Sequence, residues 1–200
     1  MRKVQKSELT KDLIVNESFK LFYENGFNAT SIDKIVEAAQ LTKGAFYYHY
    51  KNKKELVLDV ISINLQKRVY ESMISPLYQP GDVVTILKST FSNRINSFSM
   101  SEKEHGCPMN NLINEIADNE TAYQLTLSRI IEEWKAALVN IVERGKKEGA
   151  IKDSVLANSV AVYLISAYEG VRGLRKLYND DAVLDEYLDG LFFYLDSLKK

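Results

Sequence analysis

Residues 43–54 combine basic and aromatic side chains in a pattern typical of contact with nucleic acid. Four of the ten lysines and arginines in the first 54 residues lie here. Lys43 can donate to the O6 and N7 atoms of guanine or to a phosphate, and Gly44 lets the backbone approach a duplex closely. Tyr47, Tyr48 and His49 add hydrogen-bond donors on semi-rigid rings. His49 has no cysteine, histidine or acidic residue at ligand spacing, so no metal site is expected.

The elements around this segment predict a helix-turn-helix. Thr30 to Asp33 resembles a capping box at the start of a helix, and Gln40-Leu41 makes a short turn. Thr42 then caps a helix over residues 43–49. In this motif the N-terminal residues of the second helix contact base edges in the major groove.

The aromatic residues of the second helix cannot all face the core. Phe46 and Tyr50 lie four residues apart, so we expect both to be buried. Tyr47, Tyr48 and His49 are consecutive, and we expect them to be mostly exposed and available to DNA.

Helical periodicity continues through the rest of the chain and predicts an all-α fold of about nine helices. Residues 76–81 read as a loop and residues 99–106 as a polar connector. Pro108 occupies the first position of a helix. The expected helices cover residues 10–25, 30–39, 43–49, 53–75, 82–98, 108–117, 121–147, 153–178 and the segment from Asp180.

Composition excludes several protein classes. The 200 residues are 46% hydrophobic and 26% charged, which argues against a disordered chain. The single cysteine, Cys107, excludes an intrachain disulfide framework. The uncharged stretch 154–168 is shorter than the roughly 20 residues of a membrane span, and the polar start lacks an apolar signal segment. We therefore expect a cytoplasmic protein without a membrane segment.

Charge is unevenly distributed along the chain. The first 54 residues carry a balance of +4 and the remainder a balance of −5. A basic head on an acidic body is typical of a nucleic-acid binder with a second domain. From charge alone, a chance distribution explains this asymmetry equally well.

The head closely resembles the DNA-binding domain of the TetR family of bacterial transcriptional regulators. The resemblance covers about 45 contiguous residues. It implies a helix-turn-helix DNA-binding domain over residues 1–52 and a ligand-binding and dimerisation domain over residues 53–200. It also implies a homodimer that binds a palindromic operator in double-stranded DNA and is released from it by a small effector. No cofactor is expected. The matching segments are Asn25-Gly26-Phe27, Thr30-Ser31-Ile32, Ile35-Val36, Ala38-Ala39, Leu41 through Tyr50 and Lys53-Lys54-Glu55-Leu56.

The resemblance assigns roles in DNA binding by position. Lys43, Gly44 and Ala45 correspond to the base-reading start of the recognition helix. Tyr47, Tyr48 and His49 correspond to its phosphate and sugar contacts. The flanking phosphate contacts correspond to Thr30, Thr42 and Lys53.

The body supplies candidates for effector binding and for the dimer. Gly106-Cys107-Pro108 resembles a subgroup that carries Gly-Cys at this place, where some members sense electrophiles or oxidants. Cys107 can equally be a small buried hydrophobe. The ligand-binding candidates are Phe91, Phe98, Cys107, Met109, Tyr123, Trp134, Tyr163 and Glu169, for most of which plain core packing is the alternative. The dimer candidates are Gly170, Gly173, Leu188, Leu191, Phe192 and Leu195.

Three alternatives stay open on the residues alone. Glu169 is either a polar anchor for an effector or half of a surface ion pair with Arg172. The chain is either an effector-responsive regulator, most often a repressor, or a constitutive DNA-binding protein without an effector. An enzyme is disfavoured because the sequence has no phosphate-binding loop, no zinc-protease pair and no nucleophile elbow.

Overall fold

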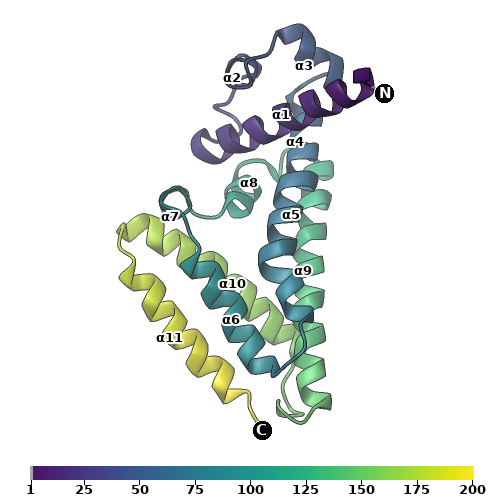
Figure 1. Ribbon diagram of the computed structural model, residues 1–200. Coiled ribbons are helices and arrows are strands. Elements are labelled where there is room, and N and C mark those ends of the chain that lie inside the picture. Colours follow the sequence, from purple (N-terminus) through teal and green to yellow (C-terminus); the bar gives the residue numbers. More distant parts are fainter. Residues whose placement is uncertain (1) are drawn as a thin grey trace. The chain divides into compact units, whose positions relative to one another are not determined.

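The computed structural model describes residues 2–200, with side chains from Ser7 onward. Its elements are helices throughout, which confirms the all-α prediction (Figure 1). Arg2, Lys3 and Lys6 belong to the basic balance of the head, and their side chains lie outside the described residues. No helix in the described range is long and apolar enough to cross a membrane.

The chain divides into two compact units. The first combines residues 1–67 with 108–128, and the second combines residues 68–107 with 129–200. The head therefore shares its unit with a segment from the middle of the chain. The functional boundary at residue 52 stays a prediction.

The first unit is built on three helices that pack against one another: α1 (Arg2–Asn25), α2 (Ile32–Ala38) and α3 (Lys43–His49). Their shared core contains the buried side chains of Ile14, Ile35 and Phe46. The apolar stripe expected in each helix is what buries these residues. α1 and α2 thereby support the short helix α3.

A long helical stretch follows the head. It starts with α4 (Lys53–Asp59), capped by the side chain of Asn52 on the Glu55 N–H at 2.9 Å. The stretch contains two π-helical segments, which single-sequence periodicity does not reveal. Its later segments are η1 (Val60–Leu65), α5 (Gln66–Val69), η2 (Tyr70–Ile74) and η3 (Ser75–Tyr78).

The second unit is a group of packed helices in which α6 and α10 each contact α11. Its helices are α6 (Val83–Asn96), α7 (Met100–His105), most of α9 (Thr121–Lys147), α10 (Ala157–Tyr178) and α11 (Ala182–Ser197). The first residues of α9, together with α8 (Pro108–Ile116), belong to the first unit.

Several predicted boundaries are confirmed. α9 covers the expected residues 121–147, Pro108 opens α8, and the Asp82 side chain caps α6 by accepting the Thr85 N–H at 2.8 Å. Each of these starts has a local chemical signal in the sequence. Asp82 and Pro108 thus mark the starts of α6 and α8 correctly.

Other boundaries were wrong. The first helix begins at Arg2 rather than residue 10. The sequence did not indicate this earlier start, because the first turns of the helix are polar and carry no apolar stripe. α10 begins at Ala157 rather than Asp153, and α11 at Ala182 rather than Asp180. The expected polar connector 99–106 contains α7, which begins with a full capping box between Ser99 and Glu102. A capping box satisfies two N–H groups at once and starts a helix without an apolar stripe.

Candidate functional site

The turn between α2 and α3 is held by side-chain caps on both sides. The Ser31 hydroxyl accepts the Lys34 N–H at 3.2 Å and so caps α2, a role that the sequence had suggested for Thr30. The Thr42 hydroxyl accepts the Ala45 N–H at 3.2 Å and caps α3 as predicted. Between them Gln40 adopts a left-handed conformation with φ of 53°, which reverses the chain in a few residues.

Phe46, Tyr47, Tyr48 and Tyr50 divide between core and surface as predicted, whereas His49 is less exposed than expected. Phe46 and Tyr50 are buried, and the Tyr50 hydroxyl donates to Asp59 at 2.8 Å. Tyr47 and Tyr48 are 54% and 75% exposed. His49 is half-buried, and its ring meets Tyr48 edge-on at 4.9 Å. The exposed face of α3 therefore presents aromatic donors, as a groove-contacting helix requires.

Lys43 lies exposed at the first turn of α3. Its ammonium pairs with the Asp33 carboxylate of α2 at 2.7 Å, and this hydrogen bond holds the pKa of Lys43 above its ordinary value. The group is therefore fully charged at neutral pH. It is held by one solvent-exposed partner that a phosphate or a base edge can replace.

Gly44 has no internal reason to be glycine. Among the side chains that the structure describes, a Cβ built there would meet only the Thr42 hydroxyl oxygen, at an ordinary 3.8 Å. The backbone at this position is helical and exposed. A side chain would therefore fit at this position, and the role of Gly44 in close approach to DNA stays a prediction.

Thr30 and Lys53 face inward rather than outward. The Thr30 side chain is fully buried, and its hydroxyl donates to Gly26 O at 2.7 Å. The Lys53 ammonium donates to Phe27 O at 2.7 Å and Thr30 O at 2.8 Å and lies 4.2 Å from the centre of the Phe27 ring. Burial lowers the pKa of Lys53, an effect that the nearby Glu115 opposes. In the protein without DNA, Thr30 and Lys53 therefore stabilise the turn after α1.

The same turn is bound by Glu115, which the sequence analysis did not identify as a site residue. The Glu115 carboxylate of α8 accepts the Phe27 N–H at 2.8 Å and the Asn28 N–H at 2.6 Å. A Cβ at Gly26 would lie 3.2 Å from both carboxylate oxygens. Lys53 thus binds the carbonyls of this turn and Glu115 binds its N–H groups. No local sequence signal links residues so far apart along the chain.

Four aromatic rings form a buried cluster in the second unit. Tyr168 lies at its centre, with ring centroids at 5.6 Å from Trp134, 5.9 Å from Phe91 and 6.3 Å from Phe98. Trp134 meets Tyr168 edge-on, a favourable aromatic arrangement. The structure therefore brings together three of the predicted ligand-lining residues and adds Tyr168.

Three other predicted lining residues lie elsewhere. Met109 and Tyr123 belong to the first unit, where the Tyr123 ring contacts Phe27. Tyr163 is exposed and pairs with Tyr194 at 4.5 Å. Cys107 is buried, and its thiol donates to the Glu169 carboxyl group beside the aromatic cluster.

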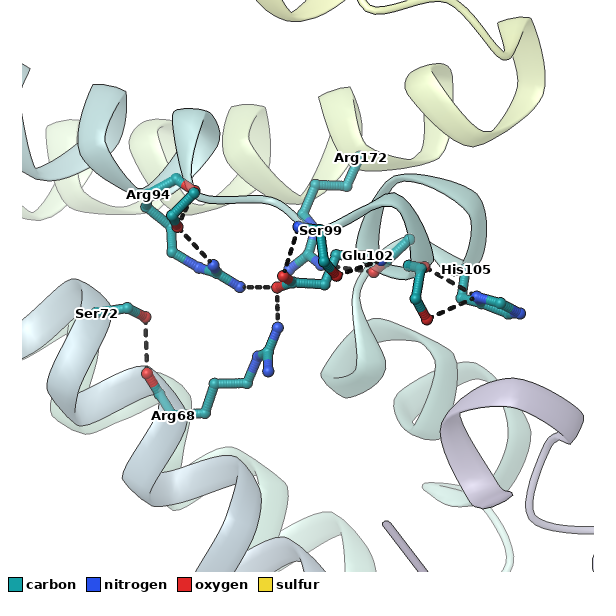
Figure 2. Close-up of polar contacts among 10 residues, drawn as sticks. Arg68, Ser72, Arg94, Ser99, Glu102, His105 and Arg172 are labelled. Carbon is teal, nitrogen blue, oxygen red and sulfur yellow. Dashed lines mark hydrogen bonds and ion pairs between the residues drawn. The ribbon is translucent and has the colours of Figure 1, made fainter. Parts of the chain in front are cut away.

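Buried arginines surround Phe98. Figure 2 shows the carboxylate of Glu102 in α7 pairing with both Arg68 and Arg94 and accepting the Ser99 N–H. The guanidinium groups of Arg94 and Arg172 each lie 4.7 Å from the Phe98 ring centre. Arg172 does not lie at the surface, as the alternative of a surface ion pair with Glu169 requires, since it is only 4% exposed and donates to Gly106 O at 2.5 Å. The extra burial comes from α7 and the loop after it, which the sequence did not predict.

Comparison with known proteins identifies the family. Residues 14–60 match the model described as bacterial regulatory proteins, tetR family, and residues 84–191 match the tetracyclin repressor-like C-terminal domain. The chain belongs to the TetR family. It is a helix-turn-helix transcriptional regulator, and this membership confirms that it is not an enzyme.

Relatives of this TetR-family chain cover nearly its whole length. It is 24% identical over 182 residues to the HTH-type transcriptional repressor DhaR of Mycobacterium sp. (strain GP1), covering 90% of this chain and 88% of DhaR. A TetR-family regulator structure from Cytophaga hutchinsonii matches with a TM-score of 0.86 at 22% identity, over 97% of this chain and 96% of the other. A TetR regulator structure from Chloroflexus aurantiacus gives the same TM-score at 23% identity, over 98% of each chain.

The last two helices of this TetR-family chain leave an apolar surface exposed. Leu191 and Leu195 were expected on it, but both are buried within the chain. Gly170 and Gly173 are exposed, and a Cβ at either would meet none of the described residues within 4 Å. The large exposed apolar residues of α10 and α11 are Val162, Tyr163, Leu174, Leu177, Tyr178 and Phe193.

Proposed function

We propose that this TetR-family regulator is a homodimeric repressor that leaves a palindromic operator when a small effector binds its second unit. The observation that carries the DNA-binding part is the exposed start of α3, where a charged lysine and an unconstrained glycine precede exposed tyrosines. The similarity to DhaR, a transcriptional repressor of similar length, supports repression.

The proposed DNA contacts follow from what each side chain exposes. Lys43, Gly44 and Ala45 would meet base edges, and Tyr47, Tyr48 and His49 would meet phosphates and sugars. Thr42 keeps an exposed side chain beside them. Thr30 and Lys53 would act by holding the preceding turn, because their polar atoms already bind backbone groups there.

The proposed dimer joins the exposed apolar surfaces of α10 and α11 in two copies. A two-fold axis places each surface against its own equivalent. The exposed glycines would let partner helices approach closely. Leu188 and Phe192 are half-buried at the edge of this surface and would contribute through their exposed atoms.

The proposed signal is a shift between two conformations. An effector lowers operator affinity only if it binds the DNA-incompetent conformation more tightly. The helical stretch from Lys53 connects the two units along the chain and is the natural lever. An apolar or aromatic effector suits the aromatic cluster. The protein would act in the cytoplasm, where its operator is.

Cys107 is the secondary sensor candidate, in keeping with the Gly-Cys resemblance. Its burial and its hydrogen bond to Glu169 favour the structural interpretation. Operator release by an electrophile, compared between wild type and Cys107→Ser, decides the matter. Equal release from both proteins would exclude this cysteine.

The experiment that tests the proposal is selection of operator DNA from a random duplex pool by the purified full-length protein. We expect an inverted repeat with half-sites about one helical turn apart or slightly more. Enriched sequences without two-fold symmetry would contradict it. Operator affinity that no small molecule changes would favour the alternative, a constitutive DNA-binding protein.

A further inference from the structure

The C-terminal end of α3 is tied to α4 by a hydrogen bond between two side chains. Tyr50, the residue at which α3 ends, is 4% exposed, and its hydroxyl donates to Oδ2 of Asp59 at 2.8 Å. Asp59 is the last residue of α4 and directly precedes the π-helical segment η1. Burial, together with this hydrogen bond, raises the pKa of Tyr50, so the hydroxyl keeps its proton and remains the donor.

The same carboxylate oxygen also binds α1. The Lys11 ammonium lies 2.7 Å from Oδ2 of Asp59 and 5.7 Å from the centre of the Tyr50 ring. Asp59 therefore joins α1, α3 and α4 at one oxygen atom. The ion pair with Lys11 is partly exposed and contributes little to stability. The bond from Tyr50 is different, because the buried ring sets the direction of its hydroxyl.

The shortness of α3 makes this bond important for the direction of the helix. All seven residues of α3 are described by the structure, and Phe46 alone among them is buried. One buried side chain fixes the position of a short helix more firmly than its direction. The start of α3 is restrained by the Thr42 cap and by the turn at Gln40. Its end is restrained by the bond from Tyr50 to Asp59.

We propose that Asp59 is a positioning residue for base recognition, which fixes the direction of α3 through Tyr50 and so places Lys43 at a base edge. Phe46 lies between the two ends of α3, so a displacement of Tyr50 tilts Lys43 as well. Base contacts are directional, whereas phosphate contacts carry no sequence information. Loss of the bond therefore weakens discrimination between sequences more than DNA binding as such. This role rests on the proposed function, in which α3 contacts the bases.

Tyr50→Phe tests the role because it removes the hydroxyl and keeps the buried ring. Affinities of the full-length protein are measured for the selected operator and for an unrelated duplex of equal length, at one salt concentration. We expect the ratio of the two affinities to fall about three- to tenfold. Tyr78→Phe, the same change at an exposed tyrosine of the second unit, should leave the ratio unchanged. A wild-type ratio in Tyr50→Phe overturns the inference.

The ratio separates positioning from a purely structural role. A variant that only lowers the folded fraction loses both affinities by the same factor, so its ratio stays at the wild-type value. A change of net charge likewise acts on both duplexes, because phosphate contacts are independent of sequence.

Two variants of Asp59 isolate the hydrogen-bond acceptor. Asp59→Asn and Asp59→Leu remove the same charge and release Lys11 alike, but asparagine keeps an oxygen for the Tyr50 hydroxyl. Asp59→Asn should therefore retain most of the wild-type ratio, and Asp59→Leu should lose as much as Tyr50→Phe. Combining Tyr50→Phe with Asp59→Leu should cause no further loss, since both remove one bond. Equal ratios in the two Asp59 variants overturn the inference, and Tyr50→Phe decides if either fails to fold.

Hydrogen exchange of the protein without DNA tests the same bond independently of any operator. Tyr50→Phe should speed exchange of the backbone N–H groups of residues 46–50 and leave that of α2 unchanged. Unchanged exchange in α3 overturns the inference. If exchange changes as expected but the wild-type protein selects no operator, the hold of Asp59 on α3 is retained and the proposed function fails. A selected operator with a wild-type ratio in Tyr50→Phe removes this inference alone.

Discussion

The Glu115 carboxylate accepts the backbone N–H of Phe27 at 2.8 Å, although the two residues lie 88 positions apart. The same carboxylate accepts the N–H of Asn28, so a side chain of α8 holds the turn that leads from α1 into α2. Charge-assisted bonds to backbone N–H groups are among the stronger hydrogen bonds in proteins. The orientation of α2, and with it α3, therefore depends on a residue from the middle of the chain.

The grip of Glu115 on this turn predicts a destabilising effect for Glu115→Gln. The variant loses one of two charge-assisted bonds and turns an amide N–H toward backbone donors. We expect the free energy of unfolding to fall by about 1–3 kcal/mol, measured by urea denaturation. Wild-type stability in Glu115→Gln would show that the bonds contribute nothing.

Two glycines provide a matched test of the same contact. Gly26 and Gly149 have φ of 86° and 75°, so alanine strains the backbone similarly at either position, by about 1–2 kcal/mol. Gly26 has the Glu115 carboxylate next to its Cβ position, while a Cβ at Gly149 meets nothing within 4 Å in the described part of the chain. Gly26→Ala should therefore destabilise more than Gly149→Ala. The difference should vanish in an Glu115→Ala background.

A variant at Lys53 distinguishes a structural role of this lysine from a phosphate contact. Its ammonium binds Phe27 O and Thr30 O, so Lys53→Met should lower the thermal midpoint and weaken binding to all DNA sequences alike. The slope of log affinity against log salt should stay unchanged. A slope reduced by about one unit would instead assign Lys53 to a phosphate. Lys54→Met, at an exposed lysine paired with Glu120, is the control.

Asp33 restrains the proposed base-reading lysine. Asp33→Asn frees the Lys43 ammonium and removes a negative charge near the DNA, so operator affinity should rise about two- to tenfold. Glu37→Gln removes an equal charge from the same helix without freeing Lys43 and should have a smaller effect. Equal gains from both variants would mean that the pair itself is irrelevant.

Phe193 tests the proposed dimer surface. Its side chain is 79% exposed on α11, so Phe193→Lys should leave the protomer folded while placing a charge in the interface. Light scattering at micromolar concentration should show monomers, with loss of most operator affinity. Tyr70→Lys, at an exposed aromatic outside α10 and α11, should remain dimeric. A dimeric Phe193→Lys would move the interface elsewhere.

The parts of the fold that sequence predicted are those set by neighbours along the chain. Thr42 caps α3, and Phe46 and Tyr50 point inward, because caps and helical spacing act over a few residues. α7 was missed because it is polar and short, although its capping box from Ser99 to Glu102 was available as a signal. Reading that box would have placed the helix.

The parts that sequence could not predict depend on distant partners. Thr30 and Lys53 have residue types suited to phosphate, yet the turn after α1 uses their polar atoms. Arg172 sits in an apolar helix where a surface position was the simplest expectation, and the Gly106 carbonyl and the Phe98 ring bury it. Leu191 and Leu195 fit an interface by type but face the interior of their own unit. Hydrophobicity does not tell an interface from a core.

The central claim is that the start of α3 reads the operator, and Lys43→Ala tests it most directly. Affinities of wild type and variant are measured across operator duplexes in which each half-site base pair is changed in turn. We predict that Lys43→Ala weakens operator binding by about tenfold to a hundredfold and flattens the preference at one symmetric pair of positions. Unchanged affinity together with an unchanged preference at every position would contradict the account.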